Sequence, residues 1–122
     1  MANRTDLSST FAVLKSILAE YAPKLTVVTD APDHYYLDAG YCEQWKKTIC
    51  FGFVRMNKKY VSFHLMPVYG CPPLLDDLSD DLKKRMQGKS CFNFKTLTPP
   101  QLKELKALTK LGFELYKKQG WV

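Results

Sequence analysis

The chain has 122 residues, of which 46% are hydrophobic and 25% are charged. This composition is typical of a globular domain with one core, and it excludes a chain that stays disordered for want of apolar side chains. We therefore expect a single domain over residues 1–122, with its core between residues 7 and 118. No apolar run approaches the ~20 residues that a membrane helix needs, so we expect no membrane partner.

The formal net charge of +6 raises the concentration of anions near the protein surface. We therefore expect a small anionic ligand or a protein as the partner. The lysines stand in short, scattered groups and form no single basic tract, so nucleic acid is an unlikely partner. Residues 1–9 lack the apolar stretch of a secretory signal, which predicts a cytoplasmic location.

The four cysteines show no metal-binding or disulfide pattern. None of them forms a C-x-x-C pair, and His34 and His64 do not complete the spacing of a zinc finger. A disulfide framework is not expected in a chain of this size without a secretory signal. We expect free thiols at Cys42, Cys50, Cys71 and Cys91.

The N-terminal third predicts one helix and two short extended segments. Residues 7–22 carry apolar side chains at helical spacing, which is typical of an amphipathic helix. Residues 25–29 are rich in β-branched side chains and predict a strand. Residues 34–37 predict a second strand or an extended loop, which we expect to be broken at Ala39 and Gly40.

A hairpin is predicted in the middle of the chain. Residues 47–56 and 60–66 have strand composition, and a three-residue polar turn separates them. Both faces of the first strand are apolar, which is typical of a strand covered on both sides. Gly52 within it indicates a bulge or a close approach by another group.

The C-terminal part predicts a short helix, a strand and a long helix. Ser79 is a candidate N-cap of the short helix, and residues 91–96 predict the last strand. Thr98 and Gln101 have the spacing of a capping box, which starts a helix that ends near Gly120. The expected fold is therefore α+β, with one antiparallel sheet of about five strands, N- and C-terminal helices and a short helix before the last strand.

Side-chain alternation in the strands predicts a polar face of the sheet. We expect the large apolar side chains of two strands to face the helices: Val61, Phe63, Leu65, Phe92 and Phe94. A loop from residue 33 to residue 45, rich in aromatic side chains, is expected to roof the opposite face. The candidate ligand contacts are Tyr36, Trp45, Ser62, His64, Asn93 and Lys95. The alternative is that this face is ordinary solvated surface and that the aromatic cluster is packing.

We interpret this pattern as a non-enzymatic module that binds a small ligand or a protein partner. A lower alternative is an enzyme in which Cys91 is a nucleophile and His64 its base, which requires the two side chains to lie within hydrogen-bond reach. The sequence offers no oxyanion or orienting motif for such an enzyme, and a structural histidine explains His64 equally simply. We therefore assign no catalytic residue.

The acidic residues cluster before and within the predicted short helix. Clustered carboxylates could bind iron or another hard cation, and the candidate ligands are Asp76, Asp77, Asp80 and Asp81. However, Asp80 and Asp81 follow Ser79 at the helix start, where the helix dipole favours negative charge. We prefer that explanation, and we expect no resident cofactor, with iron as the alternative.

Three segments carry a resemblance to a known family: KYVSFHLMPVY at residues 59–69, GKSCFNFK at residues 88–95, and residues 105–116. Together they resemble the YdhG-like family of small bacterial proteins, a domain of unknown function, over residues 7–118. The resemblance implies a compact α+β fold with an antiparallel sheet and flanking terminal helices. Some members are described as frataxin-like iron chaperones, which makes intracellular iron delivery the alternative function. This chain departs from a frataxin-type acidic ridge, because its first helix carries only Asp6 and Glu20.

Overall fold

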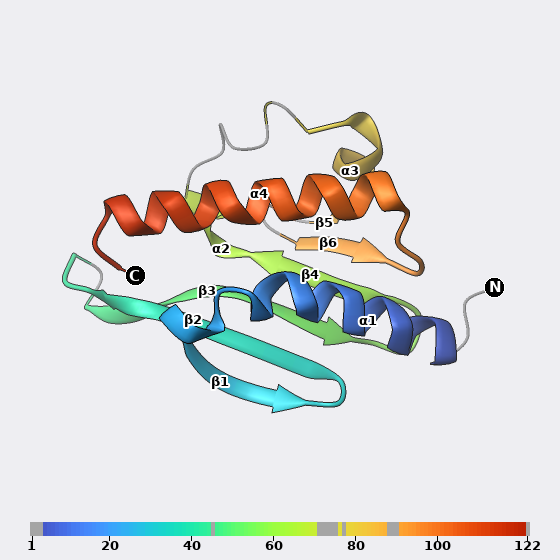
Figure 1. The fold of residues 1–122 in the computed structure, drawn as a ribbon, viewed down its shortest axis with the longest axis horizontal. Coiled ribbons are helices and arrows are strands. Elements are labelled where there is room, and N and C mark those ends of the chain that lie inside the picture. Colours follow the sequence, from blue (N-terminus) through green and yellow to red (C-terminus); the bar gives the residue numbers. More distant parts are fainter. Residues whose placement is uncertain (1–3, 45, 71–75, 77, 88–90, 122) are drawn as a thin grey trace.

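A computed structural model of the chain describes residues 4–44, 46–70, 76, 78–87 and 91–121. The described strands form one antiparallel sheet in the order β1-β2-β3-β4-β6-β5 (Figure 1). The elements in chain order are α1 (Arg4–Ala19), the 3₁₀ helix η1 (Ala22–Lys24), β1 (Thr26–Ala31), β2 (His34–Cys42), β3 (Lys47–Met56), β4 (Val61–Leu65), α2 (Met66–Gly70), α3 (Asp80–Arg85), β5 (Met86–Gln87), β6 (Cys91–Phe94) and α4 (Pro99–Lys118).

The two long helices lie on the same side of the sheet, in front of it in the view of Figure 1. They pack against the sheet around one apolar core, to which α1 contributes Leu14 and Leu18 and α4 contributes Leu105 and Leu108. The predicted α+β class, with its antiparallel sheet, terminal helices and short helix before the last strand, is confirmed. The two-residue β5 and the short helix α2 were not predicted.

Alternation in β4 and β6 places their large apolar side chains in the core, as the sequence predicts. Burial alternates along both strands, and these side chains are at most 1% exposed: Val61, Phe63, Leu65, Phe92 and Phe94. The side chains between them are half-buried and belong to the opposite side of the sheet. We call that side, which faces away from α1 and α4, the outer face.

The prediction that the strand is broken at Ala39 and Gly40 is wrong, because β2 spans both residues. The pairing of β2 with β3 is nevertheless irregular between Asp38 and Tyr41. Gly40 donates its backbone N–H to the carbonyl oxygen of Trp121 at 2.6 Å, and a Cβ on Gly40 would lie 2.7 Å from that oxygen. The glycine therefore allows the C-terminal segment to approach the strand closely. Residues 34–42 form a strand of the sheet. The prediction that they belong to a loop covering the outer face is therefore also wrong.

A bulge in β3 explains why both of its faces look apolar in the sequence. Leu37 pairs with Gly52 and Asp38 pairs with Cys50, so β3 contains one more residue than β2 at this point. The extra residue, Phe51, is fully buried in the core. The bulge expected near Gly52 is confirmed. Residues 49–52 are all buried, which agrees with the expectation of a strand covered on both sides at this point.

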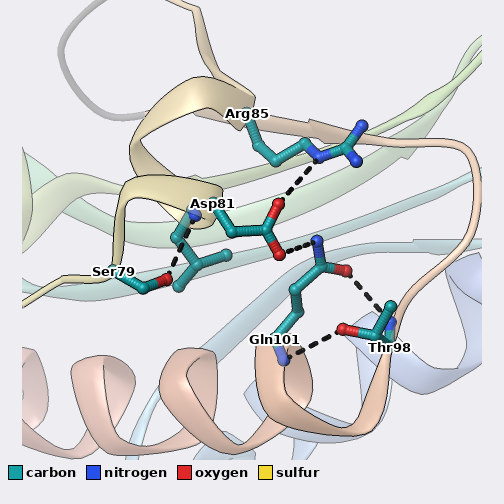
Figure 2. Close-up of polar contacts among 6 residues, drawn as sticks. Ser79, Asp81, Arg85, Thr98 and Gln101 are labelled. Carbon is teal, nitrogen blue, oxygen red and sulfur yellow. Dashed lines mark hydrogen bonds and ion pairs between the residues drawn. The ribbon is translucent and has the colours of Figure 1, made fainter.

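The predicted helix starts in the C-terminal half are confirmed. The hydroxyl of Ser79 accepts a hydrogen bond from the N–H of Leu82 at 3.3 Å and caps α3. Thr98 and Gln101 form a reciprocal capping box at the start of α4, with distances of 3.0 and 3.3 Å (Figure 2). These caps satisfy backbone donors that have no partner within their helices.

Candidate functional site

Four side chains form a row across the outer face of the sheet. Tyr36 of β2 is the register partner of Phe53 in β3, Phe53 is the partner of His64 in β4, and His64 is the partner of Cys91 in β6. Partners in antiparallel strands point to the same side of the sheet. The register therefore brings together residues that are far apart in the sequence, and we call these four residues the transverse row.

The rings of the transverse row pack against one another. The Tyr36 and Phe53 rings are stacked with centroids 5.6 Å apart, and the Phe53 and His64 rings are stacked at 4.7 Å. His34 lies edge-on to Tyr36 at 6.0 Å and to Phe53 at 5.8 Å. Such offset stacking is a favourable aromatic geometry, and Phe53 therefore constrains the plane of the His64 imidazole.

The row ends in a contact between imidazole and thiol. Nδ1 of His64 lies 3.0 Å from Sγ of Cys91, so the hydrogen-bond reach that the sequence interpretation requires is present. Burial lowers the pKa of His64 and raises the pKa of Cys91. At neutral pH the pair is therefore a neutral imidazole and a neutral thiol, with the thiol proton available for donation to Nδ1.

A second polar pair lies beside the row. Ser62 and Asn93 are register partners, and the Ser62 hydroxyl donates a 2.7 Å hydrogen bond to Oδ1 of Asn93. The amide of Asn57 lies 3.5 Å from the same hydroxyl. The outer face therefore carries neutral hydrogen-bonding groups next to the aromatic stack.

At the other end of the row, Tyr36 is held by neighbouring residues of the sheet. A hydrogen bond to Cys50, together with burial, raises the pKa of the Tyr36 phenol. Burial raises the pKa of Cys50 to about 11 and also raises the pKa of the Asp38 carboxyl. The phenol and the Cys50 thiol are therefore both neutral at physiological pH.

An open pocket of about 480 Å³ lies at the end of β3, and it is lined by Leu7, Asp33, Arg55, Met56, Asn57 and Lys58. Arg55 is the register partner of both Ser62 and His34, so it belongs to the outer face as well as to the pocket. The ionised side chains of the lining are Arg55, Lys58 and Asp33, and all three are exposed. Two cations against one carboxylate leave the pocket with an excess of positive charge.

The structure brings together most of the sequence-predicted contacts. Ser62, His64 and Asn93 lie side by side, and Tyr36 joins them through the ring of Phe53. Lys95 is exposed and lies one residue beyond the end of β6, where its backbone carbonyl accepts a hydrogen bond from Thr10. The prediction for Trp45 lies outside the described residues.

Sequence reasoning missed Phe53 and Arg55 as members of this surface. Strict alternation from the buried Phe51 assigns both to the core side, and only the bulge reverses that assignment. The glycine at position 52 is the one sequence feature that indicates such a reversal.

The candidate iron ligands of the acidic cluster are only partly described, because Asp77 lies outside the described residues. Asp80 and Asp81 occupy the first turn of α3, as the helix-start interpretation predicts. Asp81 accepts a 2.9 Å hydrogen bond from the amide of Gln101 and lies 3.9 Å from Arg85 (Figure 2). Within the described ranges, no three His, Cys, Asp or Glu side chains are grouped to hold a metal ion.

No family model, curated protein or solved structure matched the chain in the comparisons with known proteins. The YdhG-like resemblance therefore stays a prediction from the quoted segments. None of the helices in the described part of the chain combines the length and apolar character that a membrane crossing requires.

Proposed function

We propose that this protein is a non-enzymatic binding module for a small anionic molecule, held between the pocket and the transverse row. The observation that carries the proposal is the position of Arg55, which lines the pocket and also pairs with Ser62 on the outer face. A guanidinium binds carboxylate or phosphate oxygens through charge-assisted hydrogen bonds. A ligand with an anionic group at Arg55 can therefore extend its remaining part toward Ser62 and His64.

The charges of the pocket favour a ligand of low negative charge. Arg55 and Lys58 attract an anion, whereas Asp33 opposes a second negative charge. Leu7 and Met56 add apolar lining, and Phe53 adds an aromatic ring nearby. These groups suit an aromatic or aliphatic monoanion, since small-ligand sites combine apolar walls with a few orienting polar groups.

The neutral state of His64 and Cys91 supports binding over catalysis. A catalytic cysteine usually has a lowered pKa, whereas burial raises the pKa of Cys91. The hydroxyl and amide of Ser62 and Asn93 are hydrogen-bonded to each other and can orient a ligand without proton transfer. The alternative ligand of such a binding module is a protein partner that contacts the same face.

A titration followed by backbone NMR tests the proposal, with benzoate and phenyl phosphate as probes and acetate and inorganic phosphate as their counterparts without a ring. We expect the aromatic anions to shift the resonances of Arg55, Asn57, Ser62 and His64 and to bind more tightly than their counterparts. The matched variants are Arg55→Gln and Lys106→Gln, because each removes one positive charge and Lys106 is an exposed residue of α4.

Arg55→Gln should weaken binding at least about 10-fold, because a hydrogen bond to a charged group contributes roughly 1.5–3 kcal/mol. Lys106→Gln should weaken it less than about 2-fold, since it changes only the net charge. His64→Ala and Lys95→Ala test two of the six contacts that the sequence predicts. Absence of shifts at these residues with all four probes, or equal effects of both charge variants, would show that the proposal is wrong.

The iron-chaperone alternative rests on the resemblance and has no contact among the described residues in its favour. Asp81 is already engaged by Gln101 and Arg85. An anaerobic titration with ferrous iron separates the two functions, because iron binding at the predicted ligands requires line broadening at Asp76, Asp77, Asp80 and Asp81 that the anion titration does not produce.

A further inference from the structure

We infer that Cys91 is a reversible modification site that forms a mixed disulfide with a low-molecular-weight disulfide, and that His64 takes up its proton during the exchange. The inference does not depend on the proposed ligand, because it concerns a covalent step at one sulfur. It rests on the contact between the two side chains, on the stack of Phe53 against the imidazole and on the partial exposure of Cys91.

The imidazole is oriented so that Nδ1 meets the sulfur. His64 and Cys91 are direct register partners in β4 and β6, and Nδ1 lies 3.0 Å from Sγ. On the β3 side, the Phe53 ring stacks on the imidazole with an interplanar angle of 17°. This stack constrains the plane of the imidazole, and the contact with Sγ places the Nδ1 edge toward the thiol.

The accessibility of the cysteines favours reaction at Cys91. Cys42 is 4% exposed and Cys50 is 9% exposed, whereas Cys91 is only half-buried. None of these three described cysteines is in a disulfide. A disulfide reagent in solution should therefore react at Cys91 faster than at the two buried thiols.

The exchange conserves atoms and electrons. Sγ of Cys91 attacks one sulfur of the reagent R–S–S–R while the S–H proton moves to Nδ1 of His64. A new S–S bond forms on Cys91, the S–S bond of the reagent breaks, and R–S⁻ leaves with the electron pair. The leaving thiolate then takes the proton from the imidazolium, so the products are the mixed disulfide and one molecule of R–SH.

Because the Cys91 thiol is neutral at rest, the exchange needs a base that removes the thiol proton. The raised pKa of Cys91 leaves little thiolate at pH 7, and the lowered pKa of His64 leaves the imidazole neutral, so that Nδ1 can accept a proton in the tautomer that carries its hydrogen on Nε2. Proton transfer within the pair creates the reactive thiolate only as the reagent is attacked. General-base assistance of this kind contributes roughly 10²–10⁴-fold in rate.

Incubation of the full chain with excess oxidised glutathione, followed by peptide mass mapping at each cysteine, tests the inference. We expect Cys91 to gain the adduct at least about 10-fold faster than Cys42 and Cys50, and dithiothreitol to remove it. Cys91→Ser should abolish that adduct and leave the slow adducts on Cys42 and Cys50 unchanged.

His64→Phe keeps an aromatic ring against Phe53 but removes Nδ1, and it should slow the adduct on Cys91 at least about 10-fold. The matched control is His34→Phe, because His34 also contacts the Phe53 ring but does not touch Cys91. This control should leave the rate within about 2-fold of the wild type.

The pH dependence of the wild-type rate keeps the inference testable even if His64→Phe fails to fold. With His64 as base, the rate should be nearly constant between about pH 7 and pH 8.5, since both groups keep their neutral forms there. Without a base, the rate should rise about 10-fold per pH unit with the thiolate fraction. A proportional rise in the wild type, an unchanged rate in folded His64→Phe, or no adduct on Cys91 would overturn the inference.

Discussion

The hydroxyl of Tyr116 on α4 donates a 2.8 Å hydrogen bond to the carbonyl oxygen of Cys50 in β3. Cys50 directly precedes Phe51, the extra residue of the β3 bulge, and the rings of Phe51 and Tyr116 meet edge-on at 5.6 Å. Helix α4 therefore stabilises the bulge of β3. Beyond this bulge, the side chains of β3 point to the side of the sheet opposite to the one that strict alternation from Phe51 predicts. This reversal places Phe53 beside His64 on the outer face.

Tyr116→Phe should reduce the free energy of unfolding by about 1–3 kcal/mol, because a buried carbonyl loses its partner. Urea unfolding followed by circular dichroism measures the change. Tyr41→Phe is the control, since Tyr41 is 58% exposed and its loss of a hydroxyl should cost less than about 0.5 kcal/mol. Equal stability of the two variants would contradict the role of this hydrogen bond.

Gly52→Ala should destabilise the hairpin of β3 and β4. A Cβ at this position would lie 2.7 Å from the backbone carbonyl oxygen of His64, so the two strands must separate. We expect a loss of about 1–3 kcal/mol, as for other overpacked sites. The NMR resonances of His64 and Cys91 should shift as well, and unchanged resonances in a stable variant would show that the strands tolerate the methyl group.

Gln101→Glu should weaken the attachment of α3 to α4. The glutamate can still accept the hydrogen bond from the Thr98 N–H, but it replaces the amide that donates to Asp81 with a second carboxylate. We expect a loss of about 1–3 kcal/mol that diminishes in 1 M salt, since salt screens partly exposed charges. Gln44→Glu makes the same charge change at an exposed position and should have little effect in thermal unfolding.

The stability of the protein should decrease as the pH falls below about 6.5, in part because of His64. Burial lowers the pKa of His64 from its ordinary value of 6.5, so between the two pKa values the unfolded chain binds more protons than the folded chain. The contribution of neutral His64 to the stability of the fold is therefore complete above pH 6.5. It is lost as the pH falls through the pKa that His64 has in the folded protein.

Urea unfolding of the wild type and of His64→Phe at several pH values between 5 and 7.5 checks this prediction. The stability of the wild type relative to the variant should be larger at pH 7.5 than at pH 5. A pH-independent difference between the two proteins would mean that His64 has the same pKa in the folded and unfolded chains.

Local sequence features were sufficient for the elements that depend on neighbouring residues. Thr98 and Gln101 form their capping box within four residues, and Ser79 caps α3 through its own first turn. The alternation in β4 and β6 placed Ser62, His64 and Asn93 on one face, because successive side chains of a regular strand point to opposite sides.

Long-range contacts decided the features that local patterns predicted wrongly. Gly40 stands within β2, where a glycine usually weakens a strand, because the Trp121 carbonyl approaches it there. The helix predicted over residues 7–22 is shifted to Arg4–Ala19, and the chain around Pro23 forms η1.

The sequence by itself determined the α+β class, the paired strands and the polar character of one sheet face, since these follow from periodicity and composition. Only the tertiary structure decided that Tyr36, Phe53, His64 and Cys91 form one row and that Arg55, on the same face, lines a pocket. The physical reason is the register of the strands: one extra residue in β3 changes which side chains become neighbours across the sheet, and the partner strands that fix this register are distant in the chain.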